Sequence, residues 1–217
     1  YVSANHITYP VSILSDGSYN ITLDIEHPVA GLLTVGTWKM PVFIHPNDTL
    51  SISLTSVNED YQTKTSGKYA KEVDLLAKIY MSRASAEDVV YSMASKEIDE
   101  YKFWLTQRYN QYKAQYLSYR SQHNLSPEFE VYLNSELDYT YTYYLLRYRM
   151  EYPVANDLVP PLQLPSAYLE SVNSVVINNS SAILSPAYRR FLDEYIDLSR
   201  EISEKDKLFL GEDNFIV

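Results

Sequence analysis

Two long stretches of this sequence place apolar residues and tyrosines three and four positions apart, the spacing that lines one face of an α-helix. The first stretch falls within a helix that we expect over about 87–122. Its stripe consists of Ile98, Tyr101, Leu105, Tyr109, Tyr112, Tyr116 and Tyr119. The second stripe, between Pro127 and Pro153, consists of Phe129, Leu133, Leu137, Tyr141, Tyr144, Tyr148 and Tyr152. Because only a short connection separates the stretches, we expect two long antiparallel helices packed against each other.

The tyrosines of these stripes can be interpreted in two ways. Tyrosine accounts for 22 of the 217 residues and combines a flat apolar ring with a polar tip. The helical spacing favours a helix–helix core whose hydroxyls reach water at its margin. The alternative is an exposed surface for a sugar or a peptide, with Tyr109, Tyr112, Tyr144 and Tyr148 as the candidate interaction surface. Exposure of these four in one continuous patch would favour the binding surface.

The first 57 residues have the pattern of short β-strands instead. An Asp16-Gly17 turn separates residues 11–14 from residues 19–26, which alternate apolar and polar side chains with a period of two. We expect further strands over 32–35, 40–44 and 49–54. The pattern predicts an antiparallel β meander or sandwich over 1–57, a linker over 58–68 and a mostly helical region over 69–217, which together make an α+β fold.

Proline and serine mark the boundaries of the expected helices. Ser126-Pro127 and Ser185-Pro186 each offer a capping hydroxyl followed by a proline at the first helical position. We expect Pro153 to end the second tyrosine-rich helix, and the proline-rich residues 153–165 to form an extended connector. A first helix over 69–80 and a short one over 166–174 complete the helical region.

Composition argues against several classes of chemistry. The net charge of −10 argues against nucleic-acid binding, and the absence of cysteine removes thiolate nucleophiles and cysteine-based metal sites. Five glycines leave little room for a glycine-rich phosphate loop. No stretch approaches the ~18 apolar residues of a transmembrane helix. We expect no catalytic, cofactor-binding or metal-ligating residue within this chain.

The remaining polar residues indicate ordinary surface roles. His27 and His45 each precede a proline at an expected turn, which favours exposed turn histidines over metal ligands. The acidic runs over 97–100 and 194–204 alternate with lysine and arginine, as solvated helix faces do. The alternative is an enzyme that hydrolyses a sugar bond through a pair of these carboxylates.

Three strings in the first 70 residues, followed by paired long helices, carry a family resemblance. They are Asp-Gly-Ser-Tyr-Asn-Ile-Thr-Leu over 16–23, Pro-Val-Phe-Ile-His-Pro-Asn-Asp-Thr-Leu-Ser-Ile over 41–52 and Ser-Gly-Lys-Tyr-Ala over 66–70. In this order they resemble the N-terminal region of the TlpA-like thiol:disulfide oxidoreductases of Bacteroidetes, although Asn47 stands where that family has glycine. The family's C-terminal thioredoxin domain with its Cys-x-x-Cys string is absent from this chain, so the resemblance assigns redox activity to none of its residues.

The resemblance implies a non-catalytic N-terminal region that serves interaction or positioning in a thioredoxin-like protein of the bacterial envelope, periplasmic or associated with the outer membrane. Its partner would be another protein, its own C-terminal domain beyond Val217 or a second copy in a homodimer, and not a nucleic acid. We expect a signal or lipid anchor upstream of Tyr1. The alternative is a stand-alone envelope binding protein or accessory lipoprotein whose tyrosine-rich helices hold a ligand or a larger assembly.

Overall fold

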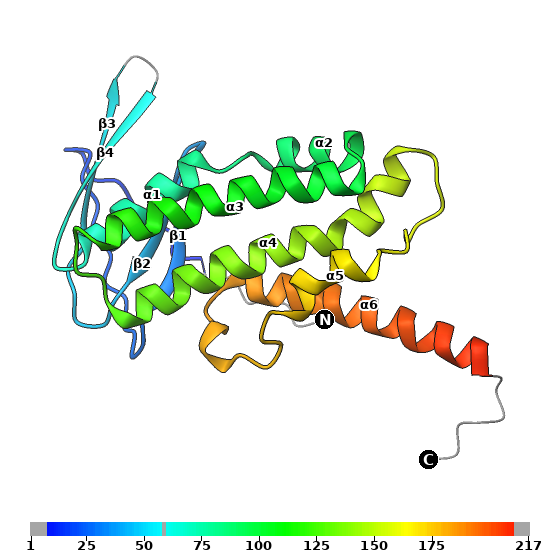
Figure 1. Cartoon of the computed structure of the whole chain (residues 1–217). Coiled ribbons are helices and arrows are strands. Elements are labelled where there is room, and N and C mark those ends of the chain that lie inside the picture. The colour runs from blue at the N-terminus through cyan, green and yellow to red at the C-terminus, as the bar shows by residue number, and fades with distance from the viewer. Residues whose placement is uncertain (1–7, 58–59, 211–217) are drawn as a thin grey trace.

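The computed structural model describes residues 8–57 and 60–210, in which four strands precede six α-helices (Figure 1). The strands are β1 (Val29–Val35), β2 (Trp38–Ile44), β3 (Ser51–Val57) and β4 (Asp60–Ser66). The helices are α1 (Ala70–Ser82), α2 (Ala86–Ser95), α3 (Ile98–Arg120), α4 (Pro127–Ala155), α5 (Ser166–Asn173) and α6 (Pro186–Leu210), with the 3-10 helix η1 (Ser180–Ala182) before the last. This order confirms the predicted α+β fold.

The strands form two separate two-stranded antiparallel sheets rather than one meander or sandwich. β1 pairs with β2 in a register that places Val35 opposite Trp38, and Gly36 makes the turn with a φ of 60°, where glycine is favoured. β3 pairs with β4, and Figure 1 shows this hairpin projecting from the rest of the molecule. β2 and β4 both contact α1, so each sheet is attached to the first helix.

Residues 8–28 contain no strand, which corrects the hairpin predicted over 11–14 and 19–26. The turn itself forms, because the Leu14 N–H donates to the Ser18 carbonyl at 2.8 Å and the Ser18 hydroxyl donates to Asp16 Oδ1 at 2.7 Å. An isolated two-stranded hairpin is only marginally stable, and Ile13 is exposed rather than covered. The turn sequence therefore folds locally without extending into a ladder.

The linker predicted over 58–68 is also corrected, because β4 occupies most of it. Residues 62–65 are all polar, so no apolar alternation marks this strand in the sequence. Backbone pairing with β3 forms it instead. Gly67 follows with a φ of 134°, and a Cβ at this position would collide with the Thr49 carbonyl oxygen, so the turn into α1 requires glycine.

The single helix predicted over 87–122 is in fact two helices, α2 and α3. Ser85 starts α2 with a capping box, in which its hydroxyl accepts from the Asp88 N–H at 3.0 Å and Asp88 accepts from the Ser85 N–H at 3.1 Å. After α2 ends, the free carbonyl of Lys96 accepts a hydrogen bond from the Tyr148 hydroxyl of α4 at 2.8 Å. Because the chain is not helical between α2 and α3, α2 can change direction and pack against α4.

The two tyrosine-rich helices, α3 and α4, lie antiparallel as predicted, whereas α6 runs in the same direction as α4 (Figure 1). α4 does not end at Pro153, as the sequence predicts, but continues through it to Ala155. Proline has no N–H to donate to the carbonyl four residues earlier, that of Arg149. The Leu162 N–H donates to that carbonyl at 2.8 Å instead, so the chain after the helix replaces the missing bond.

One hydrophobic cluster joins the sheets to the helices. Phe43 of β2 packs against Phe129 of α4, with ring centroids 5.4 Å apart, and against Tyr132 at 5.0 Å. Leu75 and Ile79 of α1 belong to the same buried cluster. A second cluster fills the space that α4 shares with α2, α3, α5 and α6. The β1–β2 sheet is thus built into the helical core, whereas the β3–β4 hairpin projects from it.

Candidate functional site

The four tyrosines of the candidate interaction surface lie in the core or at its margin. Tyr148 is fully buried, and Tyr109, Tyr112 and Tyr144 are each partly buried. Tyr109 and Tyr112 pack against the cluster around Phe43, whereas Tyr144 and Tyr148 belong to the cluster that includes α6. Because they are divided between two clusters and none is exposed, they do not form one binding patch. Their burial agrees with the helix–helix core interpretation.

The hydroxyls of these tyrosines connect neighbouring elements. Tyr109 Oη donates to Asp138 Oδ1 at 2.8 Å and so links α3 to α4. Tyr112 Oη accepts from the Ala84 N–H at 3.1 Å, in the turn that leads from α1 into α2. Each tyrosine supplies an apolar ring for packing and a polar tip for a group that would otherwise lack a partner. This double use accounts for tyrosine in place of leucine at such positions.

Alkaline pH should unfold the protein cooperatively. Burial raises the pKa of Tyr101, Tyr148 and Tyr168 above the ordinary value of about 10, and that of Tyr119 to about 12. The unfolded chain ionises first, so stability is intact below about pH 10 and falls as the pH rises toward the folded pKa values. The loss is up to about 1.4 kcal/mol per pH unit for each of the buried Tyr101, Tyr148 and Tyr168, and smaller for the partly exposed Tyr119.

Exposed tyrosines such as Tyr91 should ionise near pH 10 with the fold intact. We expect the remaining tyrosinate absorbance to appear at higher pH, in the same step in which the far-ultraviolet circular dichroism signal of the helices is lost. Ionisation of all 22 tyrosines near pH 10, with the helical signal intact, would contradict the burial of these side chains.

A buried polar cluster joins the end of β2, the start of α1 and the start of α4. His45 Nε2 lies 2.6 Å from Glu72 Oε2, and Glu72 Oε1 accepts from the Ser126 N–H at 2.7 Å. The His45 ring stacks on Tyr69 with centroids 3.7 Å apart. His45 is 6% exposed and Glu72 is 1% exposed, so the prediction of an exposed turn histidine is wrong for His45. It is confirmed for His27, which is exposed. The turn before Pro46 packs its histidine against α1 instead of presenting it to water.

A serine, a histidine and a glutamate in contact suggest a catalytic triad, but the geometry does not match one. In a triad the carboxylate and the serine occupy different ring nitrogens of the histidine. Here Ser126 Oγ, at 3.4 Å, and Glu72 both face Nε2 of His45. Ser126 Oγ also accepts from the Phe129 N–H at 3.2 Å, which caps α4. The cluster fixes a helix start and leaves no activated nucleophile.

The start of α6 repeats this arrangement. Ser185 Oγ donates to Glu136 Oε1 of α4 at 2.7 Å and accepts from the Tyr188 N–H at 3.2 Å. The Ala187 N–H donates to the same Glu136 oxygen at 3.0 Å. Glu136 and Ser185 are both buried. Both helix starts predicted from Ser-Pro are therefore confirmed, and each is anchored by a buried glutamate from an earlier helix.

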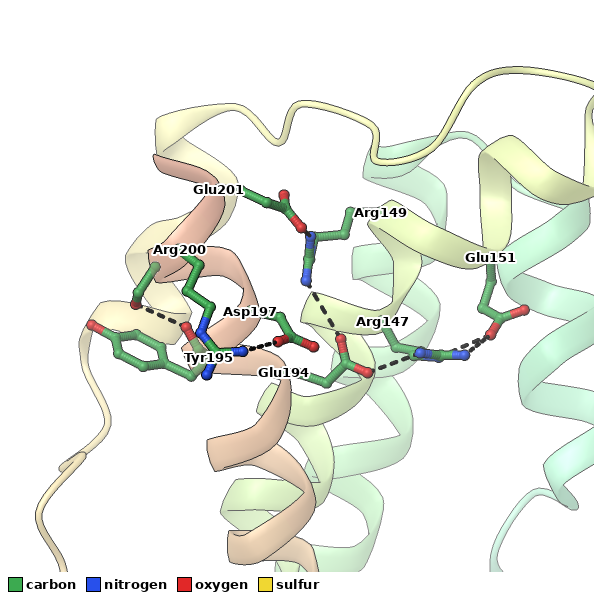
Figure 2. Close-up of polar contacts among 9 residues, drawn as sticks. Arg147, Arg149, Glu151, Glu194, Tyr195, Asp197, Arg200 and Glu201 are labelled. Carbon is green, nitrogen blue, oxygen red and sulfur yellow. Dashed lines mark hydrogen bonds and ion pairs between the residues drawn. The ribbon is translucent and has the colours of Figure 1, made fainter. Parts of the chain in front are cut away.

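An ion-pair network joins α6 to α4, and Figure 2 shows Glu194 of α6 between two arginines of α4. Glu194 lies 2.9 Å from Arg147 Nη1 and 3.7 Å from Arg149 Nη2. Arg149, only 2% exposed, also pairs with Glu201, and Arg147 pairs with Glu151 at 2.7 Å. The prediction of a solvated helix face is therefore wrong for Glu194 and Glu201. Both lie on the side of α6 that packs against α4.

The acidic runs offer little to a hydrolase. Glu194 and Glu201 are each paired with an arginine of α4, so both carboxylates are engaged in the contact between α4 and α6. Glu97 accepts from the Tyr152 hydroxyl at 2.8 Å. Asp197 and Arg200 form the solvated pair that the sequence predicts, at 3.5 Å on the exposed side of α6. Nothing in this arrangement supports the carboxylate-pair enzyme.

A shallow groove lies where β2, β4 and α1 meet, and we name it the sheet–helix groove. It is lined by Trp38, Lys39, Met40, Pro41, Thr63, Ala77, Tyr80 and Met81. Tyr80 and Met81 are exposed, and Lys39 is the one charged residue of the lining. Aromatic residues and methionine are enriched at protein interfaces. Sequence reasoning missed this surface because its residues come from three elements, one of them the unpredicted β4.

Within residues 8–57 and 60–210, no three His, Cys, Asp or Glu side chains gather as a metal site would require. In that same part of the chain, no helix is long and apolar enough to cross a membrane. Comparison of the chain with protein-family models, with curated proteins and with solved structures found no match.

Proposed function

We propose that this chain is a non-catalytic interaction and positioning region of a thioredoxin-like protein of the bacterial envelope. The order of its sequence motifs supports the family, and strands followed by paired long helices are what that resemblance implies. The buried pairs His45–Glu72 and Arg149–Glu201 support the positioning role, because they hold strands and helices in fixed relation. A rigid body of this kind can present a surface to a partner with little loss of entropy.

The sheet–helix groove is the observation that carries the interaction role. It combines Trp38, Tyr80 and Met81 with the single cation Lys39. A partner segment that packs an apolar side chain over Met81 and places a carboxylate near Lys39 matches this lining. The partner that we propose first is the thioredoxin domain that the family resemblance implies beyond Val217.

The sequence encoded after Val217 tests the family part of the proposal. A Cys-x-x-Cys string within the next domain, about 100–150 residues, would support it. A stop codon shortly after Val217 would overturn it and favour the stand-alone envelope binding or accessory protein. That alternative would need a surface other than Tyr109, Tyr112, Tyr144 and Tyr148, none of which is exposed.

Docking in the groove can be read from Trp38 fluorescence. The chain has two tryptophans, so Trp104→Phe leaves Trp38 as its only tryptophan, which can be excited selectively at wavelengths that the tyrosines do not absorb. Titration with the separately expressed downstream domain should shift its emission saturably, and Met81→Asp should weaken binding at least about tenfold. Leu117→Asp is the matched control, because Leu117 is an exposed apolar residue of α3 that does not line the groove. Binding that Met81→Asp leaves unchanged would contradict docking at this site.

A further inference from the structure

The loop between α5 and α6 exposes four aliphatic side chains, and we name residues 176–184 the aliphatic loop. Val176 and Ile177 precede η1, and Ile183 and Leu184 follow it. Their exposed fractions are 60%, 39%, 59% and 36%. Figure 1 shows this loop projecting from the helical body on the side of α4 opposite α3. Exposed apolar residues gathered in one short segment, unlike single ones scattered over a surface, indicate a contact site.

The backbone of the aliphatic loop is held by two buried tyrosines. Tyr139 Oη donates to the Val176 carbonyl at 2.7 Å, and Tyr188 Oη donates to the Ile177 carbonyl at 2.6 Å. Tyr188 Oη also accepts from the Asn179 N–H at 3.1 Å. The aliphatic side chains therefore face outward from a fixed backbone. A surface that is already ordered loses little entropy when it binds.

The aliphatic loop lies in an uncharged stretch of the chain. Residues 171–188 contain no charged side chain, although the chain carries a net charge of −10. The centre of a protein interface is depleted of charge in this way, whereas a surface for anionic lipid would carry Lys or Arg. Two copies of so acidic a chain repel each other overall, and the repulsion is weakest where both surfaces are uncharged.

The residues just after the loop are self-complementary. Arg190 and Asp193 are both exposed in the first turns of α6, and they carry opposite charges. Arg190 lies over the Tyr143 ring, 5.4 Å from its centroid. In a two-fold contact the same surface of each copy meets, so Arg190 of one copy can approach Asp193 of the other, and the reverse. Such a rim favours a second copy over an unrelated apolar partner.

We propose that a second copy of this chain docks on the aliphatic loop, in a two-fold contact that packs loop against loop. One continuous stretch of chain holds the uncharged centre, the fixed backbone and the oppositely charged rim residues. In a two-fold contact this stretch of one copy packs against the same stretch of the other. This inference goes beyond the proposed function and does not rest on it, because the sheet–helix groove lies on other elements.

Sedimentation equilibrium of the whole chain tests the contact. From about 1 to about 200 µM we expect a reversible monomer–dimer equilibrium. Ile183→Asp should weaken dimerisation at least about tenfold, because it buries an unpaired charge in the contact. The same substitution at Met81, in the sheet–helix groove, should leave the dimer constant within about twofold. Both positions are exposed, so circular dichroism should show the same helical content in each variant.

Charge reversal at the rim distinguishes a two-fold contact from other associations. Arg190→Asp and Asp193→Arg should each weaken the dimer, and the double variant should restore it to within about threefold. A chain that stays monomeric across the range, or a dimer unaffected by Ile183→Asp, would overturn the proposal. Binding to phosphatidylcholine or phosphatidylglycerol vesicles that requires Ile183, without any dimer, would also overturn it and assign the loop to lipid.

Discussion

Replacing Glu72 by alanine should lower the free energy of unfolding by about 3–5 kcal/mol. The carboxylate is almost fully buried and serves two partners, the His45 ring and the Ser126 N–H. Its removal leaves the buried imidazole of His45 and the N–H of Ser126 without their acceptor. Urea unfolding followed by circular dichroism measures the loss, which should appear as a lower midpoint with a similar slope.

Two controls identify the contact responsible. Glu170→Ala removes an exposed carboxylate of α5 and should change the unfolding free energy by less than about 0.5 kcal/mol. The double variant of Glu72→Ala and His45→Ala should cost at least about 1 kcal/mol less than the sum of the single changes, because the two side chains interact directly. Additive effects, or a cost of Glu72→Ala below about 1 kcal/mol, would contradict the assigned role.

Replacing Arg149 by alanine should be comparably destabilising, by about 3–5 kcal/mol. The guanidinium is buried between α4 and α6, where it pairs with Glu201 and Glu194. Without it, Glu201 loses its cation and Glu194 keeps only Arg147. We expect α6 to loosen from α4 first, so amide hydrogen exchange along α6 should accelerate more than exchange along α1.

A matched exposed arginine separates this effect from a general loss of positive charge. Arg200 pairs with Asp197 on the solvated side of the same helix, and Arg200→Ala should cost less than about 1 kcal/mol. Arg149→Met should cost less than Arg149→Ala, because methionine fills the space and removes a buried Nε that has no hydrogen-bond partner in the described part of the chain. Equal effects of Arg149→Ala and Arg200→Ala would contradict a buried network.

The sequence predicts those parts of this fold that depend on local chemistry. Ser126-Pro127 and Ser185-Pro186 predict the two helix starts because the capping hydroxyl and the proline act within one turn. The helical period predicts the burial of Tyr148, since a stripe of that width must face another element. The α+β order follows from the change of period after the first strands.

The predictions that were wrong concern features that depend on contacts between distant segments of the chain. The partners of His45 lie 27 and 81 residues along the chain, so its turn sequence could not reveal burial. β4 is a strand because of the backbone opposite it, and not because of its own polar side chains. One signal was available: Glu72 lies four residues before Leu76 on a buried helix face. A charged residue on such a face requires a buried partner.

The two glutamates that anchor helix starts also define an order in which the helices can form. Glu72 lies in α1 and serves the first turn of α4, and Glu136 lies in α4 and serves the first turn of α6. During synthesis from the N-terminus, each acceptor has left the ribosome before the helix that needs it. The chain can therefore add its helices vectorially, each docking onto a neighbour already made. A fragment that began after α1 would lose the first link of that sequence.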